Sequence, residues 1–228
     1  MNSVQGFILS YLKYSDNDAL IHCFTKENGY ESFFCKGIYS TKNKRKAYLQ
    51  PLNEVAIYLP NKQTGSIKNI SKIELLQNVG TDSDIKTGTI VFFIADFLNQ
   101  ILRNEVGNSD IYNEISNLAF ELKSGNTQCH LIFLFKILKI NGLHPLNSHY
   151  PYLDPERGYF IPEKSHNFFD SDISKIWKDL ISGDDLYKIR IPSKLRKDFL
   201  ESLLVYYHYH FTDFRTPKSL QILKEIFD

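Results

Sequence analysis

The first 78 residues contain five short runs rich in β-branched, aromatic and aliphatic side chains, with no helical pattern between them. The runs cover residues 6–14, 19–25, 30–36, 52–59 and 66–76. Turn-forming segments at 15–18, 27–29 and 60–65 separate several of them. Consecutive strands without intervening helices favour an antiparallel sheet over βαβ units. Five short strands in so few residues suit a small closed barrel such as an OB-fold, and other five-stranded barrels fit the count equally.

After residue 78 the pattern becomes helical. The polar segment 79–84 predicts a boundary between an OB-fold nucleic-acid-binding domain (1–78) and an α-helical domain (79–228), so the fold class is α+β. Helices are expected at 87–106, 109–123, 128–140, 171–181, from Ser193 onward as N-cap, and 220–227. Residues 131–135 are apolar on all sides, which predicts a central, buried helix. The proline-rich segment 143–167 is predicted to be irregular.

Positive charge is concentrated in one part of the predicted barrel. Between Lys36 and Lys72 there are eight basic residues and one acid, Glu54, a local balance of +7 in a chain whose net charge is +1. Clustered cations neutralise phosphates and release counterions, and neighbouring aromatic rings can stack bases. The predicted DNA-contact residues are Lys36, Tyr39, Lys42, Lys44, Arg45, Lys46, Tyr48, Lys62, Lys68 and Lys72.

Each of these signals has a plainer interpretation. A lysine-rich run taken alone is more often a solvated face, and Tyr39 and Tyr48 fit the core of the flanking strands at least as well as a stacking role. The position of the run between strands of an oligonucleotide-binding type of barrel favours the contact hypothesis.

A second basic cluster contains no acid across ten positions. Its members are Lys188, Arg190, Lys194, Arg196 and Lys197. The cluster surrounds the start of a predicted helix, where the macrodipole slightly disfavours cations. It is predicted to be either a solvated helix face or a contact for DNA or a protein partner.

Catalytic and metal-binding patterns are weak. The sequence contains no phosphate loop, nucleophile elbow, dinucleotide fingerprint or HExxH pattern. Cys23, Cys35 and Cys129 are odd in number and far apart, which argues against a disulfide framework. The three histidines of the irregular segment, His144, His149 and His166, could converge, but no cysteine lies near them. We predict no catalytic residues, no metal, no cofactor and no enzyme activity.

The chain begins without the basic and apolar regions of a signal peptide, and its apolar runs are shorter than the roughly 20 residues a membrane span needs. We therefore expect a cytoplasmic protein with no membrane partner.

Several short motifs in order resemble the bacterial recombination mediator family RecO. In the first half they are Gly6-Phe-Ile-Leu, Tyr14-Ser-Asp-Asn-Asp-Ala-Leu-Ile, Phe24-Thr-Lys-Glu-Asn-Gly29, Lys36-Gly37 and Leu49-Gln-Pro-Leu52. In the second half they are Gly142-Leu-His-Pro145 and Lys218-Ser219-Leu220. Each motif is weak alone, but the ordered set is specific and extends along nearly the whole chain.

The resemblance implies an OB-fold followed by a helical domain, and a non-catalytic DNA-repair protein associated with the nucleoid. It further implies binding of single- and double-stranded DNA, annealing of complementary strands, and association with RecR. Together with RecR such a protein helps RecA displace single-stranded-DNA-binding protein (SSB), whose acidic C-terminal tail it recognises.

One departure from the family pattern concerns zinc. Many members hold a zinc ion with four cysteines shortly after the Gly-x-x-Pro position, whereas residues 146–167 contain no cysteine here. We expect this segment to be held by packing of residues such as Tyr150, Tyr152, Tyr159 and Phe160.

Two other functions compete with the DNA-binding mediator. The first is a protein adaptor whose basic loop docks an acidic peptide tail. The second, with less support, is a metal-dependent hydrolase that uses the clustered histidines.

Overall fold

A computed structural model describes residues 2–41, 43–61, 67–80 and 84–227. Its contacts divide the chain into two compact units, Met1–Lys123 together with Pro217–Asp228, and Ser124–Thr216. The change from strands to helices near residue 79 falls inside the first of these units, so the compact units do not coincide with the predicted domain boundary. The division into domains at residues 1–78 and 79–228 therefore stays a prediction.

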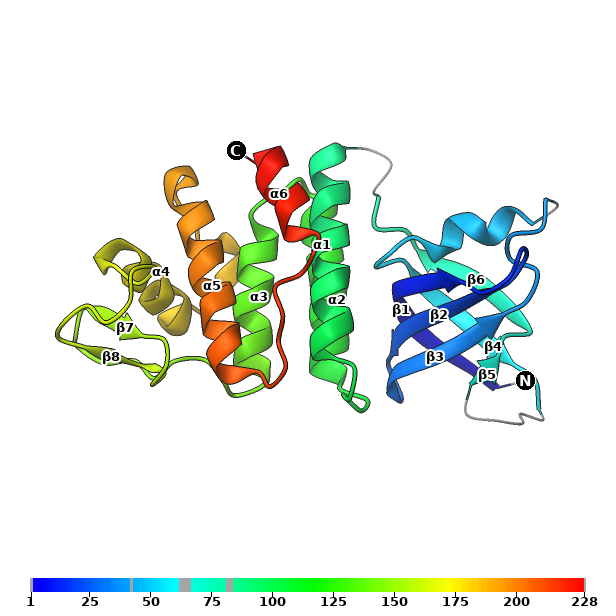
Figure 1. The fold of residues 1–228 in the computed structure, drawn as a ribbon, viewed down its shortest axis with the longest axis horizontal. Coiled ribbons are helices and arrows are strands. Elements are labelled where there is room, and N and C mark those ends of the chain that lie inside the picture. Colours follow the sequence, from blue (N-terminus) through cyan, green and yellow to red (C-terminus); the bar gives the residue numbers. More distant parts are fainter. Residues whose placement is uncertain (1, 42, 62–66, 81–83, 228) are drawn as a thin grey trace. The chain divides into compact units, whose positions relative to one another are not determined.

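The first unit contains a curled β-sheet followed by helices (Figure 1). Its elements are β1 (Asn2–Lys13), β2 (Ala19–Thr25), β3 (Gly29–Cys35), the 3-10 helix η1 (Lys44–Leu49), β4 (Glu54–Leu59), β5 (Lys68–Asn69), β6 (Lys72–Gln77), α1 (Ile85–Ile101), α2 (Ser109–Lys123) and α6 (Leu220–Phe227). The prediction of an α+β chain with an N-terminal barrel is confirmed. The predicted ranges of β2 and α6 match the structure residue for residue, and α2 begins at Ser109, one of two residues that could start it, and ends at Lys123 as predicted.

The sheet closes on itself through one segment of chain. The strand order is β5-β3-β2-β1-β4-β6, and β5 and β6 are separated only by Ile70 and Ser71. Residues 68–77 therefore pair in parallel with β3 at one end and antiparallel with β4 at the other. This closed arrangement is that of an OB-fold barrel. The predicted strand count of five was wrong, since the predicted strand 66–76 is divided into β5 and β6, which gives six.

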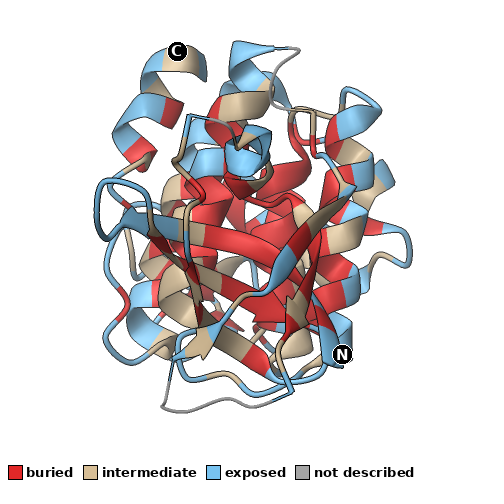
Figure 2. Cartoon of the chain, turned by 90° about the vertical axis from the view of Figure 1, so that its right-hand side faces the viewer, coloured by how far each residue is buried: buried red, intermediate tan, exposed pale blue. Residues whose placement is uncertain are grey.

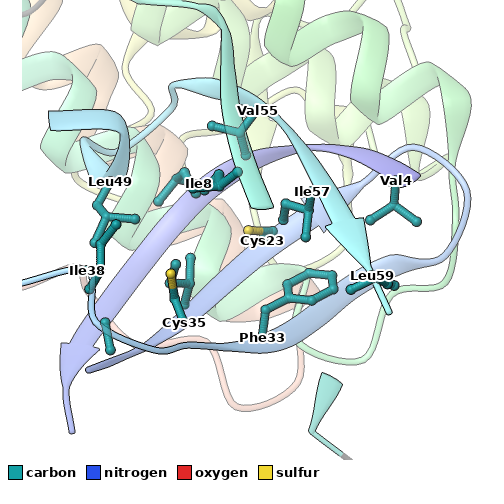
Figure 3. Packing of buried hydrophobic residues seen from close by; sticks show 13 residues of the cluster. Val4, Ile8, Cys23, Phe33, Cys35, Ile38, Leu49, Val55, Ile57 and Leu59 are labelled. Carbon is teal, nitrogen blue, oxygen red and sulfur yellow. The ribbon is translucent and has the colours of Figure 1, made fainter. Parts of the chain in front are cut away.

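The barrel is filled by side chains that alternate along its strands (Figure 3). Ile8, Cys23, Phe33, Val55 and Ile57 point into this interior and are fully shielded from solvent. Burial raises the pKa of the Cys23 thiol far above its usual range, and it raises that of Cys35 to about 11. Both thiols are therefore neutral members of the core and not nucleophiles.

Within the same unit, helix α1 packs against β1, and α2 contacts the barrel through Tyr112. The Phe7 and Tyr112 rings lie 4.8 Å apart, and the Tyr112 hydroxyl donates to Glu54 Oε1 at 2.7 Å. Ser10 and Tyr30 both donate to Asn99 Oδ1 of α1. These contacts bury one side of the barrel, and Figure 2 shows the buried residues concentrated in the interior.

The second unit is a helical assembly with a small β-hairpin. Its elements are α3 (Cys129–Ile140), β7 (Tyr152–Asp154), β8 (Tyr159–Ile161), α4 (Ser171–Ser182), the 3-10 helices η2 (Leu186–Lys188) and η3 (Ser193–Leu195), and α5 (Arg196–His210). Residues 129–135 of α3 are all buried, which confirms the predicted central helix. Ser193 was predicted as the N-cap of α5, but it begins η3, and Leu195 precedes α5 without a side-chain cap.

The segment 143–167 is more ordered than its composition indicates. Strands β7 and β8 pair antiparallel, so the prediction of an irregular segment missed a hairpin. Leu153 and Phe160 are the buried hydrophobic residues of its strands, and the Leu153 N–H donates to Ser174 Oγ of α4 at 3.0 Å. Of the four aromatic residues proposed to hold the segment, only Phe160 is buried, because Tyr150 and Tyr159 are exposed and Tyr152 is half-buried.

Within the described part of the chain, no helix combines the length and the apolar character needed to cross a bilayer.

Two glycines with positive φ allow a matched test of backbone constraint. Gly29 has φ +79°, and a Cβ there would overlap the backbone of Glu105 and Val106. Gly37 has φ +69°, but a Cβ there meets no described atom within 4 Å. Gly29→Ala is expected to lower the free energy of unfolding by more than about 3 kcal/mol, because the new Cβ overlaps the backbone. Gly37→Ala is expected to lower it by about 1 kcal/mol, because only the cost of placing alanine in the left-handed conformation remains. Urea unfolding followed by circular dichroism measures both, and equal losses would contradict the close approach at Gly29.

Candidate nucleic-acid interface

The predicted basic loop forms an ordered cover over one end of the barrel. Ile38 and Leu49 are buried in the barrel core, so the loop is attached at both ends by apolar side chains (Figure 3). Between them, Asn43 begins η1, since its side chain accepts a hydrogen bond from Arg45 N–H at 3.0 Å and donates one to Gly37 O at 3.0 Å. Buried Asn53 donates to the carbonyls of Ala47 and Tyr48 at 3.4 Å. Residues 43–49, which include Lys44, Arg45 and Lys46, are therefore held against the barrel.

The loop is also bound to the turn between β1 and β2. The Gly37 N–H donates to Asp18 Oδ1 at 2.8 Å, and the Tyr39 N–H donates to Asn17 O at 2.9 Å. The hydrogen bond from Gly37, assisted by Ser15 and by the charge of Lys36, holds the pKa of Asp18 below its usual range. Asp18 lies in the predicted turn 15–18 and in addition connects this turn to the basic loop.

Four cations are presented to solvent here, and we call them the basic loop surface: Lys36, Lys44, Arg45 and Lys46. All four side chains are exposed. None of them forms an ion pair with a carboxylate among the described residues. Lys42 and Lys62, which were also predicted to contact DNA, lie outside the described residues.

Lys68 and Lys72 differ from these four because each has a carboxylate partner. Lys68 is half-buried and pairs with Glu31, and Lys72 pairs with Glu74 at 2.5 Å. The Glu74 contact raises the pKa of Lys72. Glu31 and Glu74 lie just outside the window 36–72, so the local balance of +7 overstated the charge available to a ligand.

The predicted aromatic partners Tyr39 and Tyr48 are half-buried and pack against the barrel core. Lys46 Nζ lies 5.5 Å from the centroid of the Tyr39 ring, so this ring supports a cation of the basic loop surface. Burial, with a contribution from Tyr11, raises the pKa of Tyr39. The core interpretation of the two tyrosines fits these contacts better than free stacking platforms do.

Two exposed tyrosines outside the predicted contact residues lie at the end of β1 that meets this loop. Tyr14 is 73% exposed and rests edge-on against Phe34, with the ring centroids 5.5 Å apart. Tyr11, near Tyr39, is 41% exposed. The available signal was the position of Tyr14 directly before the turn 15–18, where a side chain projects beyond the barrel.

The second basic cluster lies in the other unit and lines two recesses there. Lys188, Arg190 and Arg196 line one, and Arg190 and Lys194 line the second together with Asp172 and Asp179. Lys188 is exposed and pairs with Asp185 at 2.7 Å. Lys197 is an exposed residue in the first turn of α5.

Three histidines of the helical region form local hydrogen bonds. His210 hydrogen-bonds Pro155 O at 2.8 Å, and His208 hydrogen-bonds Thr216 Oγ1 at 3.1 Å. His166 Nδ1 accepts from the Phe168 N–H at 3.2 Å. Among the described residues, no three His, Cys, Asp or Glu side chains are grouped so that they could hold a metal ion.

Comparison with known proteins shows what this arrangement is similar to. The barrel, closed by residues 68–77 and followed by helices, defines an OB-fold protein of the α+β class. A family model described as "Recombination protein O N terminal" matches residues 1–79. The N-terminal region therefore matches this domain of the RecO family, and the predicted resemblance to the family is confirmed.

The similarity continues beyond the barrel. A curated DNA repair protein RecO of Flavobacterium psychrophilum is 27% identical, and that of Flavobacterium johnsoniae is 28% identical. The protein of the same name from Porphyromonas gingivalis is 27% identical. Each alignment covers 98% of this chain and 98% of the relative.

Proposed function

We propose that this protein is a non-catalytic DNA-binding recombination mediator in DNA repair, and that the basic loop surface is its principal contact with DNA. The observation that carries the proposal is a group of four exposed cations, without carboxylate partners among the described residues, on a loop that covers one end of an OB-fold barrel. The similarity to proteins named DNA repair protein RecO, over 98% of the chain, supports the biological role.

The chemistry of this surface suits phosphates and not base edges. Lysine and arginine charges attract the DNA backbone whatever the sequence, and counterion release supplies most of the affinity. Three of the four cations are consecutive in η1, a spacing that can follow a backbone but provides no set of paired donors and acceptors for reading bases. Binding should therefore be independent of sequence.

Salt dependence of binding tests the proposal. Fluorescence anisotropy of a labelled single-stranded oligonucleotide is measured with the full chain at several salt concentrations. We expect the logarithm of the association constant to fall linearly with the logarithm of salt, with a slope of about −0.7 for each phosphate neutralised. Absent binding, or binding that does not change with salt, would favour the adaptor function, in which the loop docks an acidic peptide.

Tyr14 and Tyr11 give the surface a means of holding unpaired bases. An exposed ring beside a cationic track stacks on bases with about 1–3 kcal/mol for each base. We predict that Tyr14→Ala weakens binding of single-stranded DNA by about 5- to 100-fold and leaves duplex binding nearly unchanged, because paired bases offer no free face. The matched control is Tyr209→Ala, which replaces an exposed tyrosine of α5. Equal losses for the two forms of DNA would exclude a stacking role for Tyr14.

The partners follow from the family resemblance. We propose that the protein acts with RecR, recognises the acidic C-terminal tail of SSB, anneals complementary strands and helps RecA load onto SSB-coated DNA. Support comes from the similarity along both the barrel and the helical region. Reconstituted RecA loading on SSB-coated single strands, with and without RecR, tests this assignment.

A further inference from the structure

The second unit contains a recess that the barrel-based function does not use. Its volume is about 470 Å³. One wall is the segment 124–128, which precedes α3. The other wall is formed by Tyr187, Lys188 and Arg190, with Arg196 of the first turn of α5.

The recess is held open by hydrogen bonds between its walls. The buried Gln128 side chain donates to Ile189 O at 2.7 Å and accepts from the Ile191 N–H at 3.0 Å. Arg196 Nε donates to Ile191 O at 3.0 Å. The reciprocal amide pair fixes the 189–191 backbone against the start of α3, so a ligand would meet a preformed site.

The charge of the lining has one sign. Lys188, Arg190 and Arg196 are cationic, and the lining includes no carboxylate among the described residues. Lys188 is partly neutralised by Asp185, but neither arginine pairs with a described carboxylate. Because Arg196 is anchored through Nε, the terminal nitrogens of its guanidinium remain for a ligand. The start of α3 adds the positive end of a helix dipole.

The polarity of the lining distinguishes between kinds of anion. The remaining lining residues are Ser124, Gly125, Asn126, Thr127, Gln128 and Tyr187. None has an aliphatic hydrophobic side chain, so the recess offers no apolar pocket for an anchoring residue of a peptide. Arginine forks and polar donors match the several oxygens of a phosphate instead.

We propose that this recess binds a phosphate group of a nucleic-acid strand between Arg190 and Arg196, as a second contact that is independent of the barrel. The neighbouring recess differs because Asp172 and Asp179 line it along with Lys175, Arg190 and Lys194. Its mixed charge does not select an anion. The second basic cluster is thus divided between a phosphate site and a surface of mixed charge.

Nuclear magnetic resonance of the full chain tests the site with inorganic phosphate as the probe. We expect saturable shifts of the backbone amides of residues 125–128 and of the Arg190 side chain, and none when sodium chloride is added to the same ionic strength. Arg190→Gln should weaken the phosphate affinity at least ten-fold, because a charge-assisted fork is lost. Its side chain is exposed and makes no described hydrogen bond, so the fold should persist. Lys164→Gln, exposed and outside the recess lining, should change nothing.

Two further titrations, one with a DNA strand and one with an acidic peptide, identify the source of the anion. A dodecathymidylate strand is added to the Lys44→Ala, Arg45→Ala, Lys46→Ala variant, so that the barrel contact is weakened while the recess is intact. We expect the amides of 125–128 to shift, and this shift to be lost with Arg190→Gln. Equal shifts with chloride, an Arg190→Gln variant that still binds phosphate, or a DNA strand that leaves these amides unmoved would overturn the proposal. So would an aspartate-rich peptide that occupies the recess more tightly than the strand does.

Discussion

Replacing Lys44, Arg45 and Lys46 together by alanine is expected to weaken DNA binding on the order of 100-fold at about 0.1 M salt. Each phosphate neutralised on a single strand contributes a factor of about 5 at this salt concentration, since the salt slope is about −0.7 for each contact. Loss of three contacts should also reduce the slope by about 2. The same anisotropy titration measures both quantities.

The control for this triple variant carries the same change in charge at other places. Lys123, Lys139 and Lys164 are exposed lysines outside the basic loop surface, and their joint replacement by alanine should change the affinity only slightly. The basic loop is attached by Ile38, Leu49 and backbone hydrogen bonds. The variant that lacks Lys44, Arg45 and Lys46 should therefore remain folded. If both triple variants lose affinity equally, net charge and not the basic loop surface would govern binding.

Replacing Trp177 by alanine is expected to lower the free energy of unfolding by about 3–5 kcal/mol. Its ring is fully buried and lies 4.9 Å from Tyr206, 5.7 Å from Phe135 and 5.8 Å from Phe199. Its Nε1–H donates to Ser202 Oγ at 3.0 Å. The hairpin β7–β8 joins this core, since Leu153 hydrogen-bonds Ser174 on the same helix as Trp177. Packing thus holds the segment for which the resemblance to the RecO family implied a zinc site in many members.

Urea unfolding followed by circular dichroism measures this loss, because Trp177 is the one tryptophan of the chain and its fluorescence disappears with it. Trp177→Phe keeps an aromatic ring and should cost less. Tyr209→Ala, at an exposed position of α5, should change stability by less than about 0.5 kcal/mol. A Trp177→Ala variant as stable as the unchanged protein would show that this core does not stabilise the unit.

The strands and helices were predictable where local pattern determines them. The alternation along residues 19–25 and the apolar run of 131–135 are visible in the sequence and appear as β2 and the buried part of α3. The division of 66–76 into β5 and β6 was not, because Lys68 and Asn69 pair with β3, a partner more than 30 residues away. The hairpin β7–β8 was hidden by its prolines and depends on packing against α4.

The candidate site was predictable in composition but not in detail. Counting charges found Lys44, Arg45 and Lys46, which the structure leaves exposed. The count could not show that Glu31 approaches Lys68, because they meet only across neighbouring strands of the closed barrel. Nor could it show that Tyr14 is exposed while Tyr39 is half-buried, since this depends on how the β1–β2 turn meets the loop.

The closing segment 68–77 also determines what a shortened chain would expose. The same ten residues pair with both β3 and β4. A fragment that ends before residue 68 would therefore leave one edge of each of these two strands unpaired. Unpaired edges recruit strands from other molecules. A nascent or proteolysed chain at this length should therefore aggregate, and an expression boundary for the isolated barrel should lie beyond Gln77.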